Sequence, residues 1–78
     1  MNENVKPKTI ASLKIGETGI VRGFTDELMS LKLLEMGCLP GEQIEISNIA
    51  PLGDPIAIKV SGYKLSLRKQ EAATILVR

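Results

Sequence analysis

Two short runs in which apolar and polar side chains mostly alternate, residues 56–60 and 63–67, place the strongest constraint on how this chain can fold. Alternation with a period of two is typical of strands that bury one face. Only Ser61 and Gly62 separate the two runs, and so short a connection predicts a tight antiparallel hairpin with glycine at a positive φ. We therefore expect the rest of the chain to fold around this hairpin.

A rigid turn is predicted just before the hairpin, at residues 51–55, which read Pro-Leu-Gly-Asp-Pro. The two prolines restrict φ, Gly53 suits a left-handed conformation, and Asp54 can accept hydrogen bonds from nearby backbone N–H groups. Leu52 stands at the tip of this turn, where an exposed apolar side chain is ordinarily costly. The pattern favours a Leu52 that folds back over the core, and the alternative is a Leu52 that projects into a partner.

Three more segments have the pattern of strands: residues 18–24, 43–50 and 73–77. Gly23 in the first of them is a candidate β-bulge. Together with the hairpin they give five short strands, and the last is free to pair with the first. The sequence therefore predicts a mainly β fold, a small and partly open antiparallel barrel. Residues 1–8 are predicted to form a flexible N-terminal arm, and residues 9–78 a single barrel domain.

One helix is predicted after the first strand, over residues 28–36, which contain no glycine or proline. Thr25 and Asp26 are both good N-cap residues, Gly37 can end the helix in the left-handed conformation, and Cys38 can then pack back on it. The apolar residues spread around more than half of this helix, so we expect some to stay exposed. We interpret them as a wide core face, and the alternative is a groove for a partner segment.

Four motifs, in this order and spacing, resemble the FeoA family, the small cytoplasmic protein A of bacterial ferrous iron transport. They are LLEMG at 33–37 followed by LPG at 39–41, APLGDP at 50–55, GYKLSLRK at 62–69, and EA at 71–72 with Ile75 and Val77. The resemblance covers about residues 9–78. It implies an SH3-like barrel without catalytic activity of its own, which supports FeoB, the large membrane transporter whose cytoplasmic portion is a GTPase.

The composition argues against an enzyme. The chain contains no histidine, the commonest catalytic acid or base, and its single cysteine, Cys38, has no evident activating base. No GxxxxGK loop appears, so we expect no binding or hydrolysis of GTP by this chain and no cofactor. The lone cysteine excludes an internal disulfide, and no apolar run is long enough for a membrane span. These features predict a soluble, cytoplasmic protein, and the resemblance implies that it reaches the membrane only through its partner.

Neither a metal nor a nucleic acid is predicted as a ligand. The carboxylates are scattered along the chain and only one thiol is present, so we expect no specific metal site. A net charge of +1 and only two aromatic residues disfavour nucleic-acid binding. Lys59 and Lys64 are expected to share an outer face of the hairpin near Arg68 and Lys69. We interpret that face as solubilising, and the alternatives are a surface for an acidic partner or for RNA.

The resulting prediction is a binding module that contacts FeoB. The predicted partner-binding residues are Leu52, Gly53, Asp54 and Pro55 in the turn, with Tyr63 and Arg68 nearby. The alternative function is a free-standing, metal-responsive regulatory domain similar to the C-terminal SH3-like domain of iron-dependent repressors, whose winged-helix domain does not appear in this sequence. Self-association stays open at this level, as does the choice between effects on GTP turnover, nucleotide release and transporter assembly.

Overall fold

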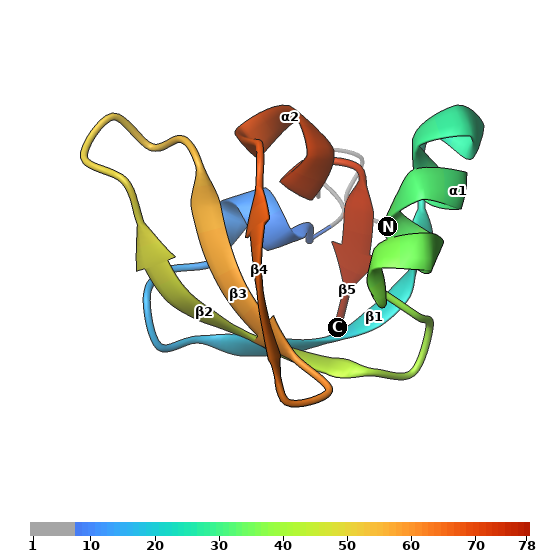
Figure 1. The fold of residues 1–78 in the computed structure, drawn as a ribbon, viewed down its shortest axis with the longest axis horizontal. Helices are drawn as coiled ribbons and strands as arrows, with labels where there is room; N and C mark the ends of the chain where they lie inside the picture. The colour runs from blue at the N-terminus through green and yellow to red at the C-terminus, as the bar shows by residue number, and fades with distance from the viewer. Residues whose placement is uncertain (1–7) are drawn as a thin grey trace, which may run out of the picture.

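The protein folds into five strands, two α-helices and one 3-10 turn, as seen in a computed structural model that describes residues 8–78 (Figure 1). In chain order these elements are η1 (Ile10–Ser12), β1 (Thr18–Phe24), α1 (Glu27–Met36), β2 (Gln43–Ile49), β3 (Ile56–Val60), β4 (Tyr63–Leu67), α2 (Lys69–Ala72) and β5 (Ile75–Val77). The predicted mainly β class, with a helix after the first strand, is confirmed. The arm predicted over residues 1–8 lies outside the described residues, apart from Lys8.

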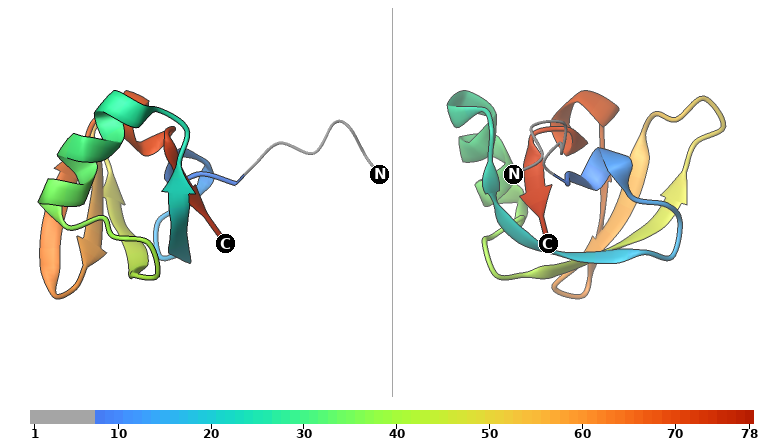
Figure 2. Two further views of the ribbon diagram at one scale, coloured as in Figure 1. Left: turned by 90° about the vertical axis from the view of Figure 1, so that its right-hand side faces the viewer. Right: turned by 180° about the vertical axis from the view of Figure 1, so that it is seen from behind.

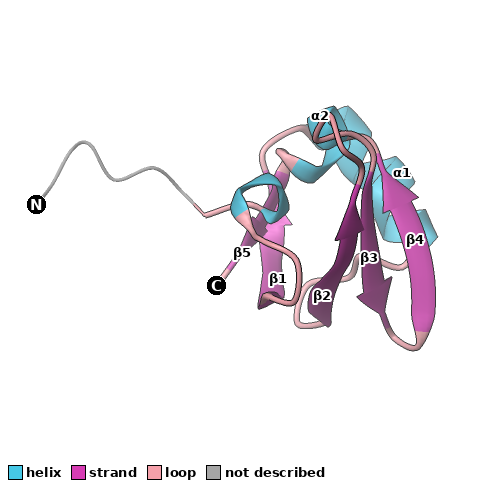
Figure 3. Ribbon diagram, turned by 90° about the vertical axis from the view of Figure 1, so that its left-hand side faces the viewer, coloured by secondary structure: helices cyan, strands magenta, loops and turns pink. Residues whose placement is uncertain are grey.

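The strands form one antiparallel sheet in the order β4-β3-β2-β1-β5 (Figure 3). The expected pairing of the last strand with the first is confirmed, with Val21 opposite Val77 and Phe24 opposite Ile75. The register of this pair shifts between Val21 and Gly23, at the predicted bulge. The sheet curls into a partly open barrel whose edges are β4 and β5, while α2 covers one end and α1 lies along the side (Figures 1 and 2).

Alternate side chains of the strands build an aliphatic core. In β2, for example, Ile44 and Ile46 are buried, while the neighbouring Glu45 is only half-buried. This alternation follows from the pleat, which turns successive side chains to opposite faces. The buried hydrophobic residues are Ile10, Leu13, Val21, Leu33, Cys38, Ile44, Ile46, Ile56, Ile58, Val60, Leu67, Ala72, Ile75 and Val77.

Both ends of α1 are capped as the sequence predicts. Asp26 is the N-cap, and its Oδ1 accepts a hydrogen bond from the backbone N–H of Met29 at 2.8 Å. Gly37 ends the helix at a φ of 109°, which side-chain-bearing residues rarely adopt. The backbone N–H of Cys38 then donates to the carbonyl of Leu33 at 3.0 Å, and both residues are fully buried. The chain is thereby turned sharply toward β2.

Only a narrow stripe of α1 packs on the barrel. Leu33 is its one buried residue, and Met29 and Met36 pack against the edge of the core. Leu28 and Leu31 are 82% and 60% exposed, which confirms that part of the apolar surface stays in water. The interpretation of a wide core face is therefore wrong, because the ten-residue helix touches the barrel along one line of side chains.

Candidate partner-binding site

The turn at residues 51–55 joins β2 to β3 and is closed by its own backbone. Gly53 has a φ of 87°, and its N–H donates to the carbonyl of Ala50 at 2.7 Å. The Asp54–Pro55 peptide bond is cis. Leu52 is 95% exposed, so the expectation that it folds back over the core is wrong. The loop extends beyond the end of the barrel (Figure 1), which leaves its tip without core surface to cover.

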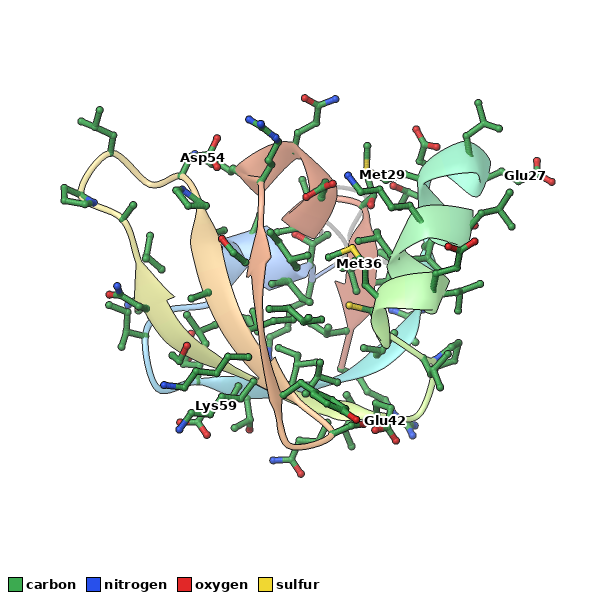
Figure 4. All side chains as sticks on the ribbon, in the orientation of Figure 1. Glu27, Met29, Met36, Glu42, Asp54 and Lys59 are labelled. Carbon is green, nitrogen blue, oxygen red and sulfur yellow. The ribbon has the colours of Figure 1, made fainter. Side chains whose placement is uncertain are left out.

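Asp54 fastens this turn to the start of α2. Its Oδ1 accepts a hydrogen bond from the backbone N–H of Lys69, the first residue of α2, at 3.0 Å. Figure 4 shows Asp54 beside that helix. The sequence predicts a bond from Asp54 to nearby backbone, whereas the donor lies 15 residues further along the chain. The carboxylate satisfies one of the free N–H groups at a helix start, so it stabilises the turn and the helix together.

An ion pair joins the two helices. The Nζ of Lys32 in α1 lies 2.5 Å from the Oε2 of Glu71 in α2. The other carboxylate oxygen of Glu71 accepts a hydrogen bond from the backbone N–H of Arg68 at 2.8 Å. The hydrogen bond from Lys32, followed by that from Arg68, lowers the pKa of Glu71 against the opposing effect of burial. Glu71 is thus a nearly buried carboxylate that stays charged at neutral pH.

A cavity of about 540 Å³ opens where α1, α2, the turn and the end of β4 meet. It is lined by Lys32, Met36, Asp54, Pro55, Ser66, Arg68 and Glu71. Figure 4 shows two of these residues, Met36 and Asp54, on either side of β4. The volume lies within the range of about 300–1,000 Å³ that is common for binding pockets. The lining is polar and open, which suits a peptide or another polar group better than an apolar ligand.

The structure brings together only part of the predicted site. Asp54, Pro55 and Arg68 line the cavity, and Leu52 and Gly53 lie in the turn beside it. Tyr63 does not join them, because it begins β4 and Arg68 follows its end. Five residues of extended strand separate the two by roughly 17 Å. Tyr63 is 69% exposed and forms a separate surface at the other end of the strand.

Four residues of the cavity are absent from the sequence-based prediction: Lys32, Met36, Ser66 and Glu71. One of them had a local signal. Glu71 stands three residues after Arg68, the spacing at which a glutamate can reach back to the N-cap backbone. Lys32 and Met36 come into place only through the packing of α1 against the barrel, so no local pattern predicts them. Ser66 lies on the outer face of β4 and had no signal that set it apart from other strand residues.

Residues 8–78 contain neither a reactive cysteine nor a cluster of metal ligands. Cys38 is fully buried; burial raises the pKa of its thiol, and the charge of Glu71 raises it further. Over the described part of the chain, no three His, Cys, Asp or Glu side chains gather closely enough to hold a metal ion. The same residues include no helix with the length and apolar character needed to cross a membrane.

The topology and the capped end of the barrel define the class as a small SH3-like barrel. A FeoA from Stenotrophomonas maltophilia, solved with zinc and described as a prokaryotic SH3 domain protein, has a TM-score of 0.78 at 22% identity, covering 91% of this chain and 89% of that one. A manganese-dependent transcriptional repressor has a TM-score of 0.79 at 16% identity, over 96% of this chain and 44% of the repressor. At these identities the likeness shows the shared fold.

Residues 8–78 match the family model described as the FeoA domain, so the chain belongs to the FeoA domain family. The structure of a FeoA-like protein from Clostridium acetobutylicum is 39% identical, with a TM-score of 0.86 over 95% of this chain and 87% of that chain. A relative from Porphyromonas gingivalis, named Fe(2+) transport protein A/Fe(2+) transporter FeoB fusion protein, is 41% identical over 46 residues. That match covers 59% of this chain but only 6% of the relative's length. The resemblance seen in the sequence is confirmed.

Proposed function

We propose that this protein is an accessory factor of ferrous iron uptake, which acts by contact with the cytoplasmic part of a FeoB-type transporter. The observation that carries the proposal is the Porphyromonas gingivalis relative, in which Fe(2+) transport protein A and the transporter FeoB form one chain. Covalent linkage holds two domains at a high effective concentration. A pair of proteins that work through direct contact gains most from such an arrangement.

The contact surface in this proposal is the turn at residues 51–55 together with Arg68. Leu52 is almost fully exposed, yet the hydrogen bond between Asp54 and Lys69 ties its turn to α2. An apolar side chain held on a rigid turn loses little conformational entropy when it is buried by a partner. Gly53 and Pro55 shape this turn, and Tyr63 offers a second contact at the far end of β4.

The proposed role needs neither catalysis nor a cofactor in this chain. It places the protein in the cytoplasm, at the membrane only through its partner, and without a nucleic-acid ligand, in keeping with a net charge of +1. The accessory protein would alter nucleotide turnover, nucleotide release or assembly of the transporter. Those three effects share one requirement, which is a measurable complex between the two proteins.

The test is binding of the transporter's soluble cytoplasmic domain, measured with and without guanine nucleotide. Leu52→Asp should weaken the complex at least tenfold, since truncating a central apolar anchor costs about 2 kcal/mol or more. Ile15→Asp is the matched control, because Ile15 is another exposed apolar residue, 59% accessible, on a different turn. Circular dichroism must show that both variants fold. Unchanged binding by Leu52→Asp would place the site elsewhere, and no binding by the wild type would refute the proposed function.

A second candidate is a metal-responsive regulatory domain. The observation in its favour is the shared fold of the manganese-dependent transcriptional repressor. Such a domain should change its oligomeric state when a divalent metal is added. Sedimentation with and without Fe(II) under anaerobic conditions separates the two candidates, because the accessory role predicts the same species in both samples.

A further inference from the structure

The outer edge of β4 is an unused pairing surface. β4 stands at one end of the strand order, so within residues 8–78 it pairs with β3 alone. Its five residues include neither proline nor glycine, the residues that most often weaken or interrupt an edge strand. An exposed strand edge presents free backbone N–H and C=O groups to any extended chain that reaches it.

The cavity described above lies against this free edge. Ser66 lies opposite Ala57 and alternates with the buried Leu67, so it belongs to the outer face of the sheet. Met36, by contrast, comes from α1 and packs against the core. Both residues line the same cavity. Groups from the two sides of a sheet can meet in one cavity only past its edge or past the ends of its strands, so the cavity borders β4 where this edge strand ends.

The charged side chains that line the cavity are two cations and two carboxylates. Both carboxylates of the cavity are already engaged, Asp54 by the N–H of Lys69 and Glu71 by Lys32 and the N–H of Arg68. Among residues 8–78, the Lys32–Glu71 contact is the one ion pair, and the guanidinium of Arg68 makes no hydrogen bond. A guanidinium offers five N–H donors in a fork that fits a carboxylate. The charge of Arg68 helps to lower the pKa of Glu71, but the N–H donors of its guanidinium stay free for an added anionic group.

A second cation stands along the same edge. Lys64 lies directly opposite Lys59, and Lys59 in turn lies opposite Glu45 on β2. Like charges directly across two strands are destabilising, so this arrangement offers the isolated domain no benefit. An acidic residue on a strand added beside β4 would neutralise Lys64. A second copy of β4 would instead bring further cations, which disfavours pairing between two copies of this chain.

The spacing of these cations specifies the complementary strand. Arg68 is still extended, with φ −69° and ψ 147°, so positions 64, 66 and 68 face one side, and Leu65 and Leu67 face the other. A matching segment carries acidic residues four apart, a polar residue midway and apolar residues between. The pattern is the same for parallel and antiparallel addition.

We propose that the free edge of β4 binds an extended acidic segment of the partner protein, which adds as a sixth strand with carboxylates beside Arg68 and Lys64. The segment's apolar side chains then lie on the same side as Leu65 and Leu67. This inference rests on the proposed function for the identity of its partner, and it names the chemistry by which that partner is recognised. Arg68 belongs both to this contact and to the surface around Leu52, so the two contacts adjoin.

The first experiment uses the acetylated and amidated peptide Glu-Val-Thr-Val-Glu as the probe. Titrated into ¹⁵N-labelled protein, it should shift the backbone amide resonances of β4. It should protect the amides of Lys64 and Ser66 from hydrogen exchange, because the N–H of Arg68 is already bonded to Glu71. The control peptide Gln-Val-Thr-Val-Gln has the same shape without charge and should bind at least about tenfold more weakly, because charge-assisted hydrogen bonds are the stronger kind. Equal binding of the two peptides would overturn the proposal.

A charge exchange at Arg68 tests the pairing directly. Arg68→Glu should weaken binding of the acidic peptide about tenfold or more. A lysine in the peptide should restore binding when it lies beside the new glutamate. The peptides Lys-Val-Thr-Val-Glu and Glu-Val-Thr-Val-Lys place that lysine for the two possible strand directions. One of them should bind the variant more tightly than it binds the wild type. Arg22→Glu, at an exposed cation on β1, is the matched control and should leave the affinity unchanged. Loss of binding without rescue by either peptide would overturn the proposal.

Three further results would count against the edge. If sodium acetate reproduces the amide shifts caused by the peptide, the site binds simple anions and not an added strand. If the protein dimerises with rising concentration in the absence of peptide, the edge of β4 pairs with a second copy of the chain. Binding of the transporter domain without any binding of the peptide would refute the β4 edge and leave the proposed function intact. Peptide binding combined with failure to bind the transporter domain supports the edge and refutes the proposed function.

Discussion

Replacing Glu71 by glutamine should test whether the ion pair between the helices stabilises the fold. Glu71 is nearly buried, with 8% of its side chain exposed, whereas the Lys32 side chain is 62% exposed. Hydrogen bonds to charged groups contribute about 1.5–3 kcal/mol, but exposed ion pairs contribute only about 0–1. Because one partner is in water, we expect Glu71→Gln to lower the free energy of unfolding by about 1–2 kcal/mol. The glutamine oxygen can still accept from the N–H of Arg68, so the helix start is retained.

Urea denaturation followed by far-ultraviolet circular dichroism measures this loss. For a domain of this size each kcal/mol corresponds to about 4–8 °C in Tm. Lys32→Met and the double variant complete a thermodynamic cycle, in which we expect a coupling energy of about 1 kcal/mol. A coupling near zero would show that the short contact between Lys32 and Glu71 does not stabilise the fold.

The dependence on pH provides an independent check. The pKa of Glu71 is lower in the folded protein than the value of about 4.3 for an unperturbed glutamate. A depressed pKa contributes stability that is fully present above the unfolded-state value and is lost as the pH falls through the folded-state value. The difference in stability between wild type and Glu71→Gln should therefore be constant near neutrality and shrink below about pH 4. A difference that persists unchanged in acid would refute this explanation.

Three other outcomes follow from the packing. Gly19→Ala places a Cβ 3.0 Å from the Cβ of Val77, so it should lower the free energy of unfolding by about 1–3 kcal/mol, measured by thermal denaturation. Gly23→Ala has no atom within 4 Å of its new Cβ and should change stability by less than about 0.5 kcal/mol. Equal effects of the two variants would contradict the packing of β5 on β1. Leu33→Ala removes the buried contact of α1 and should cost about 2–5 kcal/mol by urea denaturation, so a neutral result would mean that α1 is not anchored there. The thiol of Cys38 is buried and its pKa is raised. It should therefore react with a thiol reagent at least about a hundredfold more slowly in the folded protein than in urea. Rapid labelling of the folded protein would contradict its burial.

Local chemistry made most of the fold predictable. The alternation over residues 56–60 and 63–67 gives the bounds of β3 and β4 as observed, because the pleat turns successive side chains to opposite faces. The end of α1 at Gly37 was equally predictable. Its start was less so, because Thr25 and Asp26 were both candidate N-caps and the helix begins at Glu27, one residue before the predicted start. The predicted strand 43–50 is one residue longer than β2, and the predicted strand 73–77 is two residues longer than β5, because pairing across the sheet stops earlier than the pattern does.

The site was less predictable, because its contacts join distant parts of the chain. Asp54 bonds Lys69 across 15 residues, and Lys32 bonds Glu71 across 39. A local sequence pattern cannot predict contacts between residues so far apart in the chain. The prediction for Leu52 failed for the same reason, since an apolar residue at a turn tip is covered only if another element lies within reach, and here none of the described residues covers it.

The way the chain enters and leaves the barrel bears on how it can be joined to other domains. The carbonyl of Lys8 accepts a hydrogen bond from the N–H of Val77 at 3.0 Å, and Thr9 forms a bridge with Leu76. The two ends of residues 8–78 are therefore neighbours beside β5, at the end of the strand order away from β4. A polypeptide joined at residue 8 or residue 78 therefore starts at the opposite edge of the sheet from β4. The same adjacency makes residues 8–78 suitable for circular permutation, with residues 8 and 78 linked and new ends opened in the exposed turn at residues 51–55.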